Sequence, residues 1–296
     1  MKTYPNCKIN IGLHVLDRRS DGYHNIETIF LPIDLHDELE IVASTEMTFQ
    51  SEGIAIDGPT DRNLVMRAYR LMKEQYPTQV GNIAVRLTKN IPYGAGLGGG
   101  SADAAYTLVM LNQIFGLGVD APMMRQYAAQ IGADCPFFIE NRPAYATGIG
   151  EQLQPIELDL QSYQIVVIKP AEGVNTAEAY QRLHALRQTG TTIDREAIKR
   201  AYSQYRERVM GGERPLVTTL LQQLDNDFEA AIFPNHPTIG HIKEQMYKAG
   251  AVYAAMSGSG SAVYGFFEKG SQPKIALPDG SQRYDTRVMR QTPTVY

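Results

Sequence analysis

Apolar and polar residues alternate strictly near the start of the chain. Between Cys7 and Val15 the odd positions are apolar, whereas the even positions hold Lys8, Asn10, a glycine and His14. A period of two is typical of a β-strand, whose successive side chains point to opposite faces. We therefore predict a strand that buries one face and gathers Lys8, Asn10 and His14 on the other.

The rest of the pattern mixes strands with helices, which predicts an α+β fold with mixed sheets. A polar, irregular stretch at 151–161 indicates a boundary between two domains, 1–155 and 156–296. Further strands are predicted at 23–33, 39–49, 83–88, 163–168, 251–256 and 261–267. Helices are predicted from Leu64 to Pro77, at 101–115, from Asp120 onward, within 176–209, and at 215–231 and 238–249.

Composition narrows the class of protein. The 296 residues suggest about two domains at roughly 150 residues each. A net charge of −4 speaks against a nucleic-acid partner, and no apolar stretch approaches the roughly 20 residues of a membrane helix. With no signal peptide and two cysteines, we predict a cytoplasmic globular protein without a membrane partner. The sequence leaves oligomeric state open, with a homodimer as one expectation.

A dense glycine loop lies between a predicted strand and a predicted helix. Five glycines fall within residues 94–100. Glycine is conformationally costly, and it is used where the backbone approaches a ligand closely. A helix N-terminus offers unpaired N–H groups and a positive dipole to an anion. The loop is therefore predicted to cradle phosphate, because a flexible linker rarely sits between a strand and a well-patterned helix.

Two standard nucleotide motifs do not fit this loop. Gly94, Gly96 and Gly99 match the spacing of the dinucleotide fingerprint, but Asp120 follows a helix instead of ending a second strand. A Walker A loop would place a lysine after its last glycine, where this chain has Gly100 and Ser101.

Residues 92–101 match the signature P-x-G-x-G-L-G-G-G-S, and in this the chain resembles the GHMP kinases, a superfamily of small-molecule kinases. Other segments support the resemblance, which spans Pro5 to about Phe267. Cys7, where alanine is usual, and Tyr180, where phenylalanine can occur, depart from the pattern. The supporting segments are Lys8-x-Asn10, Asp21-Gly22-Tyr23-His24, Gly132-Ala133-Asp134-x-Pro136-Phe137, Asn175-Thr176 and 257–261.

The resemblance implies a two-domain GHMP kinase fold and an ATP-dependent kinase. The full motif set implies phosphorylation of the 2-hydroxyl of 4-diphosphocytidyl-2-C-methyl-D-erythritol, a step of mevalonate-independent isoprenoid synthesis. It also implies ATP as the phosphoryl donor and Mg²⁺ as the metal cofactor. Two other functions stay open: a GHMP kinase acting on homoserine or mevalonate, and a sensor that binds nucleotide and metabolite without turnover.

The resemblance also assigns residues to roles. Asp134 would be the general base and Lys8 its electrostatic partner, although by residue type alone they are also typical of a turn and of a solvated strand edge. Ser101 could contact Mg²⁺ or phosphate, or cap a helix. Of the histidines, His24 would read cytosine, His14 could touch substrate or fill its strand face, and the other four are expected to be structural. The implied ATP-binding residues are Pro92, Tyr93, Gly94, Ala95, Gly96, Leu97, Gly98, Gly99, Gly100, Ser101 and Ala102, and the implied substrate-binding residues are Asn10, Tyr23, His24, Thr176 and Tyr180.

Overall fold

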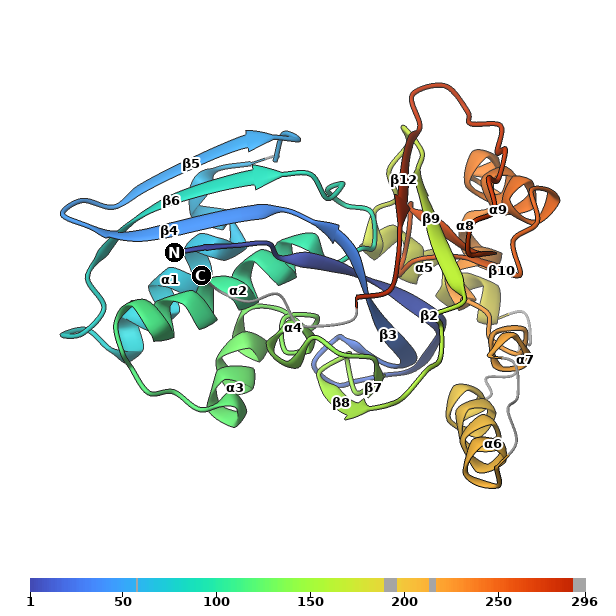
Figure 1. The fold of residues 1–296 in the computed structure, drawn as a ribbon, viewed down its shortest axis with the longest axis horizontal. Coiled ribbons are helices and arrows are strands. Elements are labelled where there is room, and N and C mark those ends of the chain that lie inside the picture. Colours follow the sequence, from blue (N-terminus) through green and yellow to red (C-terminus); the bar gives the residue numbers. More distant parts are fainter. Residues whose placement is uncertain (57, 189–195, 213–216, 290–296) are drawn as a thin grey trace.

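Three four-stranded sheets form the framework of the protein in a computed structural model, which describes residues 1–56, 58–188, 196–212 and 217–289 (Figure 1). The sheets have the strand orders β1-β4-β6-β5, β2-β3-β7-β8 and β10-β11-β9-β12. The strands are β1 (Lys2–Thr3), β2 (Asn6–Arg18), β3 (His24–His36), β4 (Glu38–Ser44), β5 (Thr48–Gly53), β6 (Asn82–Lys89), β7 (Ala144–Thr147), β8 (Gln152–Pro155), β9 (Tyr163–Lys169), β10 (Tyr253–Met256), β11 (Val263–Glu268) and β12 (Gln282–Thr286). The helices are the 3₁₀ turn η1 (Thr60–Arg62), α1 (Leu64–Gln75), α2 (Gly99–Ile114), α3 (Ala121–Ile131), α4 (Phe137–Glu140), α5 (Thr176–Arg187), α6 (Ala197–Met210), α7 (Thr218–Leu221), α8 (Asp227–Ile232) and α9 (Pro237–Lys248).

The first sheet packs against α1, α2 and α3, drawn cyan to green in Figure 1. Asn63 caps α1 by accepting a hydrogen bond from the Val65 amide, which explains why the helix begins there. The apolar faces of β4 and β6 close one hydrophobic core with these helices. This core supports both segments that flank the glycine loop, since β6 precedes the loop in the chain and α2 follows it.

The second sheet is built on the long hairpin of β2 and β3. The predicted strand is present, but its register shifts between Ile11 and Leu13. Gly12 adopts a left-handed φ of 64°, which is typical of a residue bulged out of a strand pair. The prediction that Lys8, Asn10 and His14 share one face is therefore wrong. Leu13 lines the same cavity as Lys8 and Asn10, whereas the ring of His14 pairs with Asp225.

The third sheet is buried on both faces. Alternate residues of the run Ile165–Ile168 face different cores, as expected for a continuous apolar strand. One face packs against β2 and β3, and the other is covered by α5, α8 and α9 (Figure 1). The core against β2 and β3 thus draws residues from both predicted domains, and the boundary near 155 stays a prediction.

The α+β class predicted from the pattern is confirmed, with local differences. The single helix predicted at 215–231 is wrong, because the backbone at Asp225 and Asn226 pairs with Leu13 and separates α7 from α8. The strands β7, β8 and β12 were not predicted; β7 and β8 have four residues each, too few to show a period. Residues 189–195, within the helices predicted at 176–209, and residues 215–216, at the start of the helix predicted at 215–231, lie outside the described residues. In the described parts of the chain, every helix is too short or too polar to cross a membrane.

Candidate active site

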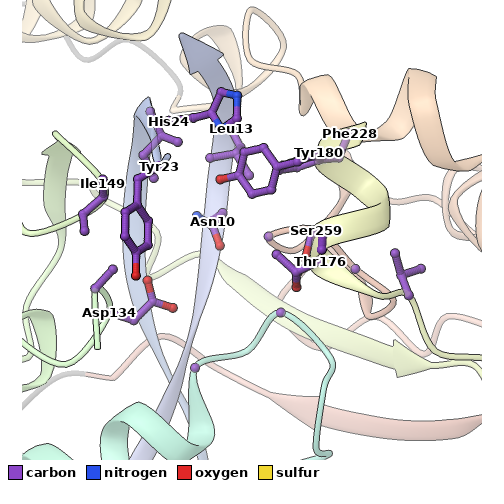
Figure 2. Close-up of a pocket in the computed structure, with 18 of the residues that line it drawn as sticks. Asn10, Leu13, Tyr23, His24, Asp134, Ile149, Thr176, Tyr180, Phe228 and Ser259 are labelled. Atoms are coloured by element: carbon purple, nitrogen blue, oxygen red, sulfur yellow. Dashed lines mark hydrogen bonds between the residues drawn. The ribbon is translucent and has the colours of Figure 1, made fainter. Parts of the chain in front are cut away.

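A cavity of about 1030 Å³ lies where β2, the glycine loop, the start of α5 and the 257–261 loop meet. Both proposed catalytic residues and all five proposed substrate-binding residues line it, together with part of the glycine loop. Figure 2 shows Tyr23 and Asp134 on one side of the cavity and Thr176, Tyr180 and Ser259 on the other. The predicted residues that line it are Lys8, Asn10, Tyr23, His24, Gly94, Gly96, Gly98, Ser101, Asp134, Thr176 and Tyr180.

The glycine loop presents its backbone to this cavity. A Cβ atom at Gly96 would lie 1.9 Å from the carbonyl oxygen of Ser257, so only glycine fits between the two loops. Gly98, with φ 69°, is the N-cap residue of α2, and no side chain caps that helix. The first amides of α2 therefore keep their hydrogen-bonding capacity for a ligand, which suits an anion. Since α2 begins at Gly99, Ser101 lies in its first turn, and the N-cap alternative for Ser101 is wrong.

Lys8 and Asp134 meet beside the loop. The Lys8 ammonium nitrogen lies 3.2 Å from Asp134 Oδ2 and 4.8 Å from the centre of the Phe30 ring. The backbone amide of Lys8 donates to the carbonyl of Leu97, which ties β2 to the loop. The Lys8 side chain is 4% exposed and that of Asp134 is 30% exposed. The carboxylate is therefore both paired with a cation and reachable from the cavity.

Asn10 connects this pair to its surroundings. Its Oδ1 accepts a hydrogen bond from Lys8 Nζ at 2.7 Å, and its Nδ2 donates to Thr28 Oγ1 at 3.1 Å. Its backbone amide donates to Ser257 Oγ, and its backbone carbonyl accepts from the Tyr264 hydroxyl. The Asn10 carboxamide therefore already holds Lys8, and a substrate would meet its second amide hydrogen or the remaining lone pair of Oδ1.

Aromatic rings line the opposite end of the cavity. His24 and Tyr180 stack with centroids 4.7 Å apart, and Phe228 meets Tyr180 edge-on at 5.0 Å. Tyr23 is 60% exposed and lies on the side of Asp134, across the cavity from Tyr180 (Figure 2). Burial and the nearby charge of Arg18 lower the pKa of His24, which favours its neutral ring. Burial raises the pKa of Tyr180, and the charge of Asp134 adds to the effect, so its hydroxyl stays protonated.

The 257–261 loop completes the wall next to the glycine loop. Ser257 Oγ donates to the carbonyl of Gly96 at 2.9 Å. The hydroxyls of Ser259 and Thr176 lie 3.0 Å apart and join this loop to the start of α5. This segment therefore packs on the glycine loop as well as joining β10 to β11.

Some predicted loop residues do not reach the cavity. Ala95, Leu97 and Ala102 are buried in hydrophobic cores, and Tyr93 is 56% exposed. Pro92, Gly99 and Gly100 also lie outside the lining, and they shape the loop and the start of α2.

Sequence reasoning missed several residues that line the cavity. Arg18 precedes the Asp21-Gly22-Tyr23-His24 segment. Its nearness to that segment was the only feature of the sequence that could have suggested that Arg18 lines the cavity. His184, expected to be structural, follows Tyr180 by one helical turn and could have been found from that spacing. Leu13 and Phe228 depend on the bulge at Gly12 and on long-range packing, which no local pattern reveals. The missed lining residues include Leu13, Arg18, Ile149, Gln181, His184 and Phe228.

The residues that line the cavity suit a metal ion that is bound mainly by a ligand's own oxygens. They suit less well a metal ion that is coordinated by protein side chains alone. Within the described ranges no group of three or more His, Cys, Asp or Glu side chains could hold a metal. Among the described residues that line the cavity, Asp134 is the only carboxylate, and Ser101 adds a hydroxyl oxygen. Mg²⁺ keeps several waters and is commonly bound through few protein oxygens plus substrate phosphates.

Comparisons with known proteins show the family of the chain. The model of the GHMP kinases N terminal domain matches residues 63–142, and that of the GHMP kinases C terminal domain matches residues 216–279. The chain is 46% identical over 269 residues to the 4-diphosphocytidyl-2-C-methyl-D-erythritol kinase of Parabacteroides distasonis, covering 91% of this chain and 92% of the relative. It is 44% identical over 283 residues to the protein of the same name from Bacteroides thetaiotaomicron, covering 94% and 95%.

Solved structures have the same fold. A crystal structure of 4-(cytidine 5'-diphospho)-2C-methyl-D-erythritol kinase superposes with a TM-score of 0.70 at 32% identity, covering 97% of this chain and 99% of the other. A homoserine kinase from Cytophaga hutchinsonii gives a TM-score of 0.71 at 18% identity, covering 100% and 97%, and shows the fold alone. The GHMP kinase fold expected from the glycine loop is confirmed.

Proposed function

Because the chain belongs to the family of 4-diphosphocytidyl-2-C-methyl-D-erythritol kinases within the GHMP kinases, we propose that it transfers the γ-phosphoryl group of ATP to the 2-hydroxyl of that alcohol. This reaction is a step of mevalonate-independent isoprenoid synthesis. The observation that carries the proposal is the 3.2 Å contact between Lys8 and Asp134 in the cavity that the glycine loop lines. The contact brings a base and a cation to the phosphate cradle, as phosphoryl transfer to an alcohol requires.

Asp134 would accept the proton of the attacking hydroxyl. Its carboxylate is partly exposed to the cavity, so a substrate hydroxyl can reach it. The ammonium of Lys8 would stabilise the ionised carboxylate before transfer and the alkoxide as it forms. The hydroxyl oxygen would attack phosphorus directly while the bond to the ADP oxygen breaks, without a phosphorylated enzyme.

The glycine loop and the start of α2 would hold the triphosphate. The uncapped amides of α2 would bind phosphate oxygens. Mg²⁺ arriving with ATP would neutralise charge on the transferred group, with the Ser101 hydroxyl as the loop's oxygen ligand. The close packing of Ser257 on Gly96 would keep the loop in one conformation while the nucleotide exchanges.

The aromatic end of the cavity would recognise the cytidine group. Tyr23 and Tyr180 come from opposite sides of the cavity and offer ring faces for stacking (Figure 2). A neutral His24 ring can donate one hydrogen bond and accept another, as the edge of cytosine requires. Thr176, at the start of α5, would contact the substrate from the same side as Tyr180.

Acceptor specificity gives the decisive experiment. Release of ADP is measured with Mg²⁺ and each of three acceptors: 4-diphosphocytidyl-2-C-methyl-D-erythritol, homoserine and mevalonate. We expect turnover with the first, and competitive inhibition by CDP against it. Comparable turnover with homoserine or mevalonate, or no effect of CDP, would contradict the proposal. No turnover with any of the acceptors would favour the non-catalytic sensor.

A second measurement tests direct transfer. With γ-labelled ATP, label should move to the alcohol without a labelled enzyme that persists and then passes its label on.

An ATP-dependent reaction needs a compartment that supplies ATP, which supports the cytoplasmic location. A homodimer and the lack of a nucleic-acid partner stay predictions from the sequence.

A further inference from the structure

Thr28 lies behind the proposed catalytic pair, in the middle of β3. The side chain is fully buried and does not line the cavity. Its hydroxyl donates to the backbone carbonyl of Gly12 at 2.5 Å and accepts from Asn10 Nδ2 at 3.1 Å. Thr28 therefore links the β2 backbone to the residue that holds Lys8.

The bulge at Gly12 creates the acceptor that Thr28 uses. Thr28 pairs with Leu13 across the hairpin, and Gly12 is left without a partner in the register. A side chain at Gly12 would lie 3.0 Å from Ile198 and 3.2 Å from Leu224, and its φ of 64° also favours glycine. The bulged carbonyl is buried, so the Thr28 hydroxyl satisfies a group that would otherwise cost free energy.

The direction of these hydrogen bonds fixes the orientation of the Asn10 carboxamide. A threonine hydroxyl has one hydrogen, and donating it to Gly12 leaves only lone pairs for Asn10. The amide nitrogen of Asn10 must therefore face Thr28, which turns Oδ1 toward Lys8 at 2.7 Å. In the opposite orientation two donors, the carboxamide nitrogen and the ammonium, would face each other.

We propose that Thr28 is a positioning residue for the phosphoryl-transfer reaction. It acts through Asn10 to hold the Lys8 ammonium against Asp134, and it touches neither substrate. The inference rests on the proposed function, because it assumes that Lys8 and Asp134 serve the transfer. Misplacement of a reacting group by about 1 Å can cost on the order of 100-fold in rate. The hydroxyl of a single buried threonine therefore controls turnover.

The test compares kcat with KM in two variants that lack the hydroxyl, Thr28→Val and Thr28→Ala. We expect kcat to fall roughly 10- to 100-fold, by analogy with the loss of groups that orient reacting side chains. The KM for ATP should keep its wild-type value, because the glycine loop is unchanged. Thr28→Ser retains the donor and acceptor and should restore kcat. A wild-type kcat in either folded variant that lacks the hydroxyl would overturn the inference.

Thr107→Val is the matched control. Thr107 is also fully buried, and its hydroxyl donates to the backbone carbonyl of Asp103 at 2.7 Å, away from Asn10. Both valine variants lose one buried hydrogen bond and should unfold at a lower temperature, but only Thr28→Val should lose turnover. An equal loss of kcat in Thr107→Val would reduce Thr28 to a structural role and overturn the inference.

A double-mutant cycle tests whether Thr28 acts through Asn10. Adding Thr28→Val to Asn10→Ala should change kcat little, because the carboxamide that Thr28 orients is already gone. Full additivity of the two losses would contradict the pathway through Asn10. The wild-type protein is assayed first with the diphosphocytidyl alcohol: no turnover there overturns the proposed function itself, whereas wild-type turnover with an unaffected Thr28→Val overturns this inference alone.

Discussion

Two buried lysines, Lys8 and Lys89, form ion pairs near the glycine loop, and their carboxylate partners differ in exposure. Lys8 pairs with Asp134, whose side chain is 30% exposed to the cavity. Lys89, the last residue of β6, pairs with both Asp37 and Asp103. Its Nζ lies 2.7 Å from Asp103 Oδ2, and the side chains of Asp37 and Asp103 are 0% and 3% exposed. One lysine thus meets a carboxylate that a substrate can reach, and the other is sealed in a cluster beneath the loop.

The sealed cluster has the features of a structural device. Asp37 Oδ1 accepts hydrogen bonds from the backbone amides of Asn90 and Ile91, where the chain enters the loop. Lys89 and Asp103 precede and follow the loop, so their ion pair joins its two ends. Burial raises the pKa of Asp103 to about 7, and the charge of Asp37 adds to this rise, although the Lys89 ammonium opposes it.

The difference between these two lysines is one of access. Burial alone would lower the pKa of Lys89, but the charges of Asp103 and Asp37 raise it above the usual value, so the ammonium stays charged where no ligand can use it. At Asp134 a lone pair remains available to the cavity. Exposure of the carboxylate therefore separates a pair that can perform chemistry from a pair that holds the loop in place.

Replacing Asp134 should give the largest effect. Asp134→Asn keeps the shape of the side chain but removes the base, so turnover should fall roughly 10²- to 10⁴-fold. The free energy of unfolding should change by only about 1 kcal/mol, because the pair is partly exposed and Lys8 keeps Asn10. Steady-state kinetics and urea unfolding of the same preparation measure both.

Glu38→Gln is the control for Asp134→Asn, since Glu38 forms an exposed ion pair with Lys2. It should alter neither turnover nor stability appreciably. Wild-type turnover in Asp134→Asn would show that Asp134 is not the general base. The Lys8–Asp134 pair would then have no catalytic role to distinguish it from the Lys89 cluster.

Replacing Lys89 should affect stability more than chemistry. Lys89→Met leaves two buried carboxylates without a cation, and breaking a buried pair in this way costs about 3–5 kcal/mol. The free energy of unfolding in urea measures the loss. Lys2→Met, at an exposed pair, is the matched control and should cost about 1 kcal/mol or less. Equal stability of the two variants would show that the cluster beneath the loop is not a structural device.

The sequence allowed the open pair to be predicted better than the sealed cluster. The period of two placed Lys8 and Asn10 on one face, and the glycine density indicated the loop, because both signals are local; the pairing of Lys8 with Asp134 was implied by the resemblance to the GHMP kinases. Lys89, Asp37 and Asp103 gave no such signal: each is an ordinary charged residue until the fold brings the three together. The same limit explains the error at His14. A bulge depends on how two strands pair, so the alternation of apolar and polar residues along a single strand does not reveal it.

A third ion pair, exposed on one side, should give the smallest effect. Burial by itself lowers the pKa of His14, but the hydrogen bond to Asp225 and the charges of Asp227, Asp225 and Glu27 raise it above its ordinary value of 6.5. A raised pKa in the folded state means that protonated His14 stabilises the fold. This stabilisation is complete below pH 6.5 and is lost as the pH rises through the folded pKa.

His14→Asn should remove that pH dependence. In the wild-type protein this contribution to the free energy of unfolding should be lost as the pH rises from 6.5 through the folded pKa of His14, and the variant should lack it. The Asp225 side chain is 76% exposed, so water screens the pair and limits the effect to about 1 kcal/mol or less. His241→Asn is the control, because the ring of His241 contacts Gln245. If the His14 contribution equalled the loss in Lys89→Met, exposure of the carboxylate would not set the strength of these pairs, and the contrast between the two lysines would need another cause.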